Sequence, residues 1–209
     1  AKAIVVNHVE GRTFAEDDVR SDANLARILP LIRRTHVEAY RHLRGPVCAF
    51  WPFRVCRDYG FFLEEQGGRM ASEVDRLRAV NERLEVIVGP IEVVLGHNDL
   101  LAGNFIDDGA RIWLIDWEHA GLSSPLFDLA NLASNNSLSD AQENWLLENY
   151  FERPADEELQ RRFRAMKCAS ILREAMWSMV SESTSTLDFD YAAYADQYMA
   201  RFEAEYEGL

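Results

Sequence analysis

The chain carries long stretches in which apolar residues recur every three or four positions, and a short central region with the pattern of strands. The first kind of spacing predicts amphipathic helices, and the second predicts half-buried strands. The helical stretches are residues 13–43, 53–66, 71–88 and 154–209, with a break near 183–188. The strand patterns are residues 91–95, 105–106 and 112–115. We therefore expect an α+β fold that is mostly helical.

Capping sequences predict where several helices begin. Thr13-Phe14-Ala15-Glu16 and Ser139-Asp140-Ala141-Gln142 have the spacing of capping boxes, so we expect helices to start there, the second running to about residue 151. Ser124-Pro125 predicts an N-cap and a first helical residue, opening a helix through about residue 133. Pro30 predicts a kink or break in the first helix, because proline removes an intrahelical hydrogen bond.

The N-terminal residues predict a strand. The β-branched run Ala3-Ile4-Val5-Val6 continues through Val9, and Gly11 ends it. A strand without a partner leaves its backbone groups unpaired. We therefore expect that further residues precede this run in the complete protein.

Composition narrows the class of protein. With 209 residues, 48% of them hydrophobic, the chain can bury a core. A net charge of −13 argues against binding to nucleic acid, which depends on Lys and Arg, and suits a cationic small molecule better. No apolar run is long enough for a membrane span, and three dispersed cysteines suggest neither disulfides nor a zinc site. We expect a cytoplasmic protein.

The candidate chemistry lies in the central region. Asp99 and Asn104 have the Asp-x-x-x-x-Asn spacing of a kinase catalytic loop, and Asp116 follows the next hairpin, where kinases hold a metal-binding Asp. A carboxylate at Asp99 can orient and deprotonate an attacking hydroxyl, while oxygens of Asn104 and Asp116 suit Mg²⁺. Gly103 is expected to let the backbone turn before Asn104. The alternative is an ordinary turn followed by a hairpin, with Asp116 solvated at a strand end.

Five segments together resemble the choline/ethanolamine kinase family, whose relatives are the aminoglycoside phosphotransferases. The segments are Gly96-His97-Asn98-Asp99-Leu100 with Asn104, Leu114-Ile115-Asp116-Trp117-Glu118-His119-Ala120-Gly121, Phe127-Asp128-Leu129-Ala130-Asn131, Trp177-Ser178-Met179-Val180 and Asp188-Phe189-Asp190-Tyr191. The resemblance implies a protein-kinase-like fold and transfer of the γ-phosphoryl group of MgATP. It covers the hinge and the C-terminal lobe of that fold.

The resemblance also implies roles for single residues. Asp99 would be the catalytic base, and Asn104 and Asp116 the Mg²⁺ ligands. Asp128 would accept hydrogen bonds from the catalytic loop, although an acid in the first turn of a helix can equally serve the helix dipole. His97 is expected to pack and hydrogen-bond within the loop.

The N-terminus resembles the hinge strand between the two lobes of such kinases. Residues 1–12 would be the hinge, residues 13–209 the helical catalytic lobe, and backbone groups of Asn7, His8 and Val9 would meet the adenine of ATP. The Gly-rich phosphate loop and the paired lysine of the family's N-terminal β lobe are absent from this sequence. We expect the chain alone to be a poor kinase.

The acceptor is expected to be a small cationic alcohol. Aromatic faces and carboxylates hold quaternary ammonium groups, and Trp117, Glu118, Trp177 and Tyr191 are the candidates. The sequence departs from choline kinases at two of their aromatic positions, which Glu174 and His119 occupy here. Choline, ethanolamine, thiamine and other amino alcohols therefore stay open as acceptors.

Two other functions remain open. One is an aminoglycoside phosphotransferase, and the other is a non-catalytic binding module derived from a kinase. The oligomeric state does not follow from the sequence.

Overall fold

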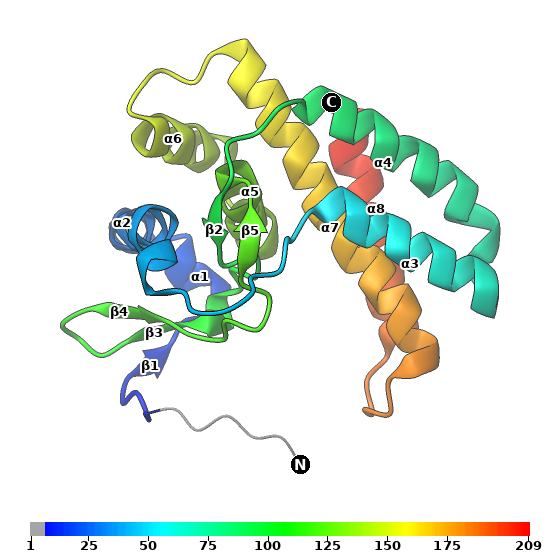
Figure 1. The fold of residues 1–209 in the computed structure, drawn as a ribbon, viewed down its shortest axis with the longest axis horizontal. Coiled ribbons are helices and arrows are strands. Elements are labelled where there is room, and N and C mark those ends of the chain that lie inside the picture. The colour runs from blue at the N-terminus through cyan, green and yellow to red at the C-terminus, as the bar shows by residue number, and fades with distance from the viewer. Residues whose placement is uncertain (1–6) are drawn as a thin grey trace.

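The computed structural model describes residues 7–209, and this part of the chain is mostly helical (Figure 1). The α-helices are α1 (Glu16–Val19), α2 (Asp22–Glu38), α3 (Pro52–Gln66), α4 (Val74–Val88), α5 (Pro125–Asn136), α6 (Asp140–Phe151), α7 (Glu157–Thr184) and α8 (Tyr191–Glu207). The strands are β1 (Arg12–Thr13), β2 (Val94–Gly96), β3 (Phe105–Asp107), β4 (Ile112–Leu114) and β5 (Gly121–Ser123). Short 3₁₀ turns are η1 (Ala39–His42), η2 (Ala71–Glu73) and η3 (Ala102–Asn104). The expected mostly helical α+β fold is confirmed.

Helix α7 is the central support of the fold. It crosses the molecule diagonally in Figure 1, and α3, α4, α5 and α8 all pack against it. The helix begins where the carboxylate of Asp156 accepts a hydrogen bond from Leu159 N at 2.8 Å. Phe163, Leu172 and Met176 are among its buried residues. These helices cover apolar side chains on several faces of α7. The helices on either side of α7 therefore share one hydrophobic core.

Two small antiparallel sheets bring the central loops together. One has the order β1-β3-β4 and the other pairs β2 with β5. Phe105 lies opposite Leu114 in the first sheet, and Gly96 opposite Gly121 in the second. Just beyond the first pair, Ile115 N donates to Asn104 O at 3.0 Å. This register places the residues that follow β4 beside the end of the loop that precedes β3.

The N-terminal predictions need two corrections. Residues 3–6 of the expected strand lie outside the described residues, while residues 7–10 have no regular secondary structure and β1 forms only at Arg12–Thr13. Thr13 pairs with Ile106 instead of capping a helix. Helix α1 starts at Glu16 because the carboxylate of Asp18 accepts a hydrogen bond from Ala15 N at 2.9 Å.

The first long helix also differs from its prediction. Pro30 lies inside a continuous α2, because the buried side chains of Leu25, Ile28, Leu29 and Ile32 hold the helix against the core and offset the missing hydrogen bond. The α-helix ends at Glu38 and continues as the 3₁₀ turn η1. Val37, in the last turn of α2, and Tyr40, in η1, are exposed although they continue the apolar spacing of the helix.

The other elements lie close to their predicted positions. The hairpin turn between β3 and β4 is confirmed, and Ser124 caps α5 by accepting from Leu126 N at 3.2 Å. The capping box at Ser139 and the break before α8 are also found. Strand β5 was not predicted, because Gly121-Leu122-Ser123 contains no β-branched residue and one large apolar side chain. Within residues 7–209, no helix combines the length and apolarity that a membrane crossing needs.

Candidate active site

The loop that contains Asp99 is held by a buried carboxylate on α5. We call residues 96–104 the Asp99 loop. Asp128 is fully buried and accepts hydrogen bonds from His97 N at 2.8 Å and Asn98 N at 2.7 Å. Asp128 therefore braces the loop in addition to lying in the first turn of α5, so the two roles expected for it coexist.

Helix α2 supplies a second partner for Asp128. The Nε2 atom of His36 lies 2.8 Å from Asp128 Oδ2, and its Nδ1 lies 2.7 Å from the hydroxyl of Tyr150. Burial acts to raise the pKa of Asp128, but the hydrogen bonds from His36, His97 N and Asn98 N outweigh it, so the pKa lies below its ordinary value. An ionised carboxylate only accepts, so Nε2 of His36 carries a proton.

Two further amides on α5 fix the middle of the Asp99 loop. Asn131 Oδ1 accepts from Leu100 N at 2.6 Å, and Asn136 Nδ2 donates to Leu100 O at 2.9 Å. Asn131 is itself held by Ser170 of α7, whose Oγ lies 3.1 Å from Asn131 Nδ2. The loop is thus attached through α5 to the central helix.

His97 connects the Asp99 loop to the residues that follow β4. Its Nε2 lies 2.9 Å from Ile115 O, and its Nδ1 accepts a hydrogen bond from Asp99 N at 3.3 Å. The two contacts together place the proton on Nε2, because a carbonyl oxygen only accepts. The ring of Trp117 packs edge-on against His97, with 4.9 Å between ring centroids. The packing and hydrogen bonding that the sequence predicts for His97 are present.

Asp99, Asn104 and Asp116 lie at the junction of these segments. Asn104 Nδ2 donates to Asp99 O at 2.8 Å and to its Oδ2 at 3.3 Å, which orients the carboxylate of Asp99. Asp116 directly follows Ile115, whose backbone N–H bonds to Asn104 O. Asp99 is half-buried, Asn104 is buried and Asp116 is exposed. The fold therefore brings the backbone of the segment that contains Asp116 against the end of the Asp99 loop, across the 17 positions that separate residues 99 and 116.

Unusual backbone conformations occur within this region. Asn98 and Asp116 have φ values of 66° and 60°, in the left-handed region that residues other than glycine rarely adopt. A side chain at Gly96 would approach Asn98 Oδ1 to 2.8 Å, so a larger residue there would force the buried Asn98 side chain to move. A side chain at Gly103 would meet nothing within 4 Å, so the expectation that Gly103 is needed for the turn is wrong. The turn before Asn104 is the 3₁₀ turn η3, which other residues can form.

The side-chain oxygens of Asn104 and Asp116 are suited to a metal ion that takes its other ligands from a bound molecule. Within residues 7–209, no group of three or more His, Cys, Asp or Glu side chains is placed to hold a metal ion. The side-chain nitrogen of Asn104 faces Asp99. The side-chain oxygen of Asn104 therefore points away from Asp99. A hard amide oxygen and the exposed carboxylate of Asp116 fit Mg²⁺, which commonly takes one or two protein ligands together with phosphate oxygens.

The predicted acceptor residues form two groups. Trp117 and Glu118 follow β4, where Trp117 is 42% exposed and donates to Leu114 O at 3.0 Å. Trp177 on α7 packs edge-on against Tyr191 at the start of α8, with 5.8 Å between ring centroids. Trp177 is 37% exposed, so it is only partly a core residue.

The residues predicted to meet adenine lie in the N-terminal segment. Asn7 and His8 are exposed, and Val9 is half-buried. They precede β1, which pairs with β3 directly after the Asp99 loop.

Sequence reasoning missed four polar residues that support the site. They are His36, Asn131, Asn136 and Tyr150. One signal was available, since Asp128 and Asn131 are three residues apart and share a face of their helix. For His36 the signal was absent, because its partner lies 92 residues away in sequence.

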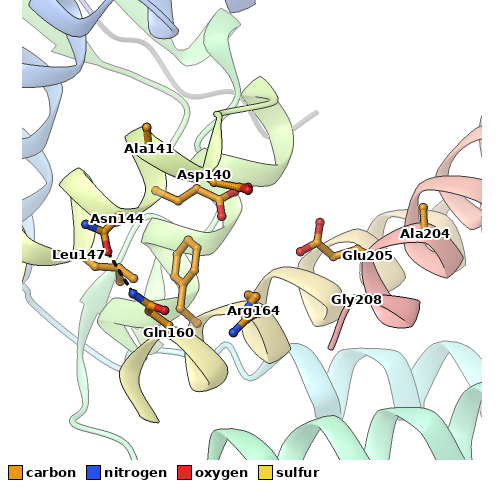
Figure 2. Close-up of a pocket in the computed structure, with 11 residues that line it drawn as sticks. Asp140, Ala141, Asn144, Leu147, Gln160, Arg164, Ala204, Glu205 and Gly208 are labelled. Atoms are coloured by element: carbon orange, nitrogen blue, oxygen red, sulfur yellow. Dashed lines mark hydrogen bonds between the residues drawn. The ribbon is translucent and has the colours of Figure 1, made fainter. Parts of the chain in front are cut away.

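A separate cavity lies between α6, α7 and the end of α8 (Figure 2). Its volume is about 610 Å³, and its walls include Asp140, Gln160, Arg164 and Glu205. None of the predicted site residues lines it. This cavity therefore lies apart from the candidate site.

Comparison with known proteins gives a consistent family. The family model described as choline/ethanolamine kinase matches residues 5–165. Ethanolamine kinase 2 from Mus musculus is 31% identical over 217 residues, covering 90% of this chain and 55% of that protein. The protein LicA from Haemophilus influenzae is 36% identical over 103 residues, covering 48% of this chain and 30% of that protein.

A solved structure shares the fold. A choline/ethanolamine kinase family protein from Mesorhizobium loti superposes with a TM-score of 0.81 at 24% identity, covering 93% of this chain and 66% of that one. The matched regions span 30% to 66% of the length of these proteins. Because the family model covers most of the chain, including the Asp99 loop and the strands around it, the chain belongs to the choline/ethanolamine kinase family.

Proposed function

We propose that this chain is the catalytic lobe of an ATP-dependent kinase that transfers the γ-phosphoryl group of MgATP to the hydroxyl of a small amino alcohol. The observation that carries the proposal is the junction of Asp99, Asn104 and Asp116. Asn104 orients the carboxylate of Asp99, and the backbone bond from Ile115 to Asn104 brings the segment that contains Asp116 next to Asn104. Family membership supports the same reaction class.

Asp99 is the residue proposed to touch the acceptor. Its carboxylate accepts the proton of the attacking hydroxyl, and the amide of Asn104 keeps the carboxylate aimed in one direction. His97, bonded to both Asp99 N and Ile115 O, holds the base and the Asp116 segment in register. Precise placement matters because phosphoryl transfer depends mainly on positioning and on charge stabilisation.

Asn104 and Asp116 are proposed to hold Mg²⁺ together with ATP. Bound there, the ion would neutralise charge on the transferred phosphoryl group. Asp116 is exposed, so its carboxylate is accessible to a nucleotide-bound ion. The segment Asn7–His8–Val9 is proposed to be the hinge whose backbone meets the adenine, with residues 1–12 as the hinge and 13–209 as the catalytic lobe. A roof over the nucleotide would come from an N-terminal lobe.

Trp177 and Tyr191, with Trp117 and Glu118, are proposed to bind the acceptor. Trp117 and Trp177 are partly exposed, and aromatic faces near a carboxylate attract an ammonium group. The relatives named as ethanolamine kinases support a small amino alcohol as the acceptor.

The test is substitution of the base. Asp99→Asn, made in the full-length gene product, should lower kcat by at least about a hundredfold and leave the affinity for ATP nearly unchanged. The measurement is ADP release with choline, ethanolamine, thiamine and an aminoglycoside as acceptors, alongside calorimetric binding of ATP. Undiminished turnover in the variant would remove Asp99 from the reaction, and turnover restricted to the aminoglycoside would overturn the amino-alcohol assignment.

A further inference from the structure

Four aromatic side chains cluster where α7 ends and α8 begins. Trp177 packs edge-on against Tyr191 and Tyr194, with ring centroids 5.8 and 6.4 Å apart. Phe189 packs against the same two tyrosines, at 4.9 and 5.5 Å. Trp177 and Phe189 are 37% and 52% exposed, so apolar ring surface remains open to a ligand. We call these four residues the aromatic cluster.

A carboxylate is fixed at the border of the aromatic cluster. Glu174 lies one helical turn before Trp177, and therefore on the same side of α7. Its Oε1 accepts from the hydroxyl of Tyr194 at 3.1 Å, and its Oε2 accepts from a terminal nitrogen of Arg173 at 2.6 Å. Its side chain is only 12% exposed. The carboxylate is thus held by two hydrogen bonds in a partly dry environment.

The hydrogen-bonding capacity of Glu174 is not exhausted by these partners. An ionised carboxylate has about four acceptor positions, and each carboxylate oxygen of Glu174 accepts one hydrogen bond. Burial raises the pKa of Tyr194, and the nearby carboxylate of Glu174 raises it further, so Tyr194 stays a neutral donor toward Glu174. The free acceptor positions can take hydrogen bonds from a ligand that enters beside Trp177.

The chemistry of the ammonium group then decides which alcohol is favoured. A fully methylated ammonium has no N–H and gains mainly from aromatic faces. A primary ammonium has three N–H donors, and its charge-assisted hydrogen bonds require fixed acceptors once water is removed. The aromatic cluster offers one carboxylate inside its border. Asp190 caps Ala193 N, Glu182 pairs with Arg69 and Glu174 pairs with Arg173. Of these three carboxylates, Glu174 is the one that bonds to a ring of the aromatic cluster, through the hydroxyl of Tyr194.

We propose that Glu174 makes this protein prefer an amino alcohol whose ammonium carries N–H donors over its quaternary counterpart. This inference rests on the proposed function, since it assumes that the acceptor binds at the aromatic cluster. Glu174 acts here as a specificity residue that contacts the acceptor. It takes no part in the transfer of the phosphoryl group.

The test compares a methylation series. Affinities of ethanolamine, N-methylethanolamine, N,N-dimethylethanolamine and choline are measured by calorimetry on the full-length gene product and on its Glu174→Gln and Glu182→Gln variants. The wild-type protein should bind ethanolamine roughly tenfold or more tighter than choline, the range that hydrogen bonds to a charged group provide. Glu174→Gln should weaken ethanolamine by a similar factor and change choline by less than about threefold. Glu182→Gln, on the same helix, should leave the series as in the wild type.

The outcomes separate this inference from the proposed function. Glutamine keeps the size of the side chain and an acceptor for Tyr194, and urea unfolding verifies that the variant is folded. If the wild type binds choline as tightly as ethanolamine, or if Glu174→Gln weakens both equally, the inference is overturned while the kinase assignment stands. If no member of the series binds and none stimulates ADP release, the proposed function fails and the inference fails with it.

Discussion

Asp128 is a single buried carboxylate that three hydrogen bonds keep ionised. It accepts from two backbone N–H groups of the Asp99 loop and faces Nε2 of His36. An apolar or amide side chain cannot satisfy the same three donors, because an amide offers one acceptor oxygen and adds donors of its own. The position of the Asp99 loop therefore depends on this one charge.

We expect Asp128→Asn to lower the free energy of unfolding at pH 7 by about 3 kcal/mol, the cost of removing one partner from a buried charged network. Urea unfolding followed by circular dichroism measures the change. The sign of the pH dependence follows from the lowered pKa of Asp128. The stabilisation is present above the ordinary pKa, near 3.8, and is lost as the pH falls below it through the folded-state pKa.

The gap between wild type and Asp128→Asn should therefore narrow when unfolding is repeated at pH 3.5. A gap of constant size between pH 7 and pH 3.5 would show that the shape of the side chain matters and its charge does not.

Helix ends give a prediction at the scale of the element. Ser137 ends α5 in the left-handed conformation, with φ of 53° and ψ of 49°, and its side chain is exposed. Glycine adopts this conformation without the steric cost of a Cβ. We expect Ser137→Gly to raise the free energy of unfolding by about 0.5 to 1 kcal/mol.

The matched control is Ser183→Gly, an exposed position within α7. Glycine inside a helix costs conformational entropy, so this variant should lose about 0.5 kcal/mol. Urea unfolding of both variants decides the point. If Ser137→Gly lowers stability as Ser183→Gly does, the strain assigned to Ser137 is absent in solution.

Elements also differ in how far the apolar pattern predicted their burial. In α4, Val74, Leu77, Val80 and Leu84 recur at helical spacing and are all buried, whereas Ile87, which continues the spacing, is half-buried. In α3, Phe61 matches the apolar period but is 59% exposed, and the guanidinium carbon of Arg78 lies 5.4 Å from its ring centroid. Periodicity predicts which face of a helix is apolar, and it does not say how much of that face another element covers.

At the scale of the whole molecule, burial separates the three cysteines. Cys48 is exposed, whereas Cys56 and Cys168 are buried, and burial raises the pKa of each of these two thiols to about 12. We expect one thiol to react rapidly with Ellman's reagent at pH 8 in the folded protein, and two more to react only after denaturation. Cys48→Ser should abolish the rapid phase. Rapid reaction of a second thiol would mean that α3 or α7 opens in solution.

Much of the fold could be predicted from local patterns. The helical stretches, the β3–β4 hairpin and the cap at Ser139 depend on residues within a few positions of one another, so the sequence itself contains the necessary information. The start of α1 was misplaced because Thr13 has a stronger partner in β3 than in its own helix. Local propensity gives way where a distant strand provides hydrogen bonds.

The candidate site also has a part that local patterns predict and a part that they do not. Sequence alone determined the identity and order of Asp99, Asn104 and Asp116, because the spacing of residues in one loop and one hairpin is a local property. Only the tertiary structure decided what holds them, since His36, Asn131 and Asn136 come from helices far away in sequence. It also decided the setting of Glu174 beside Tyr194, 20 residues apart. Hydrogen bonds between distant segments form only once the core has packed, so no local sequence pattern predicts them.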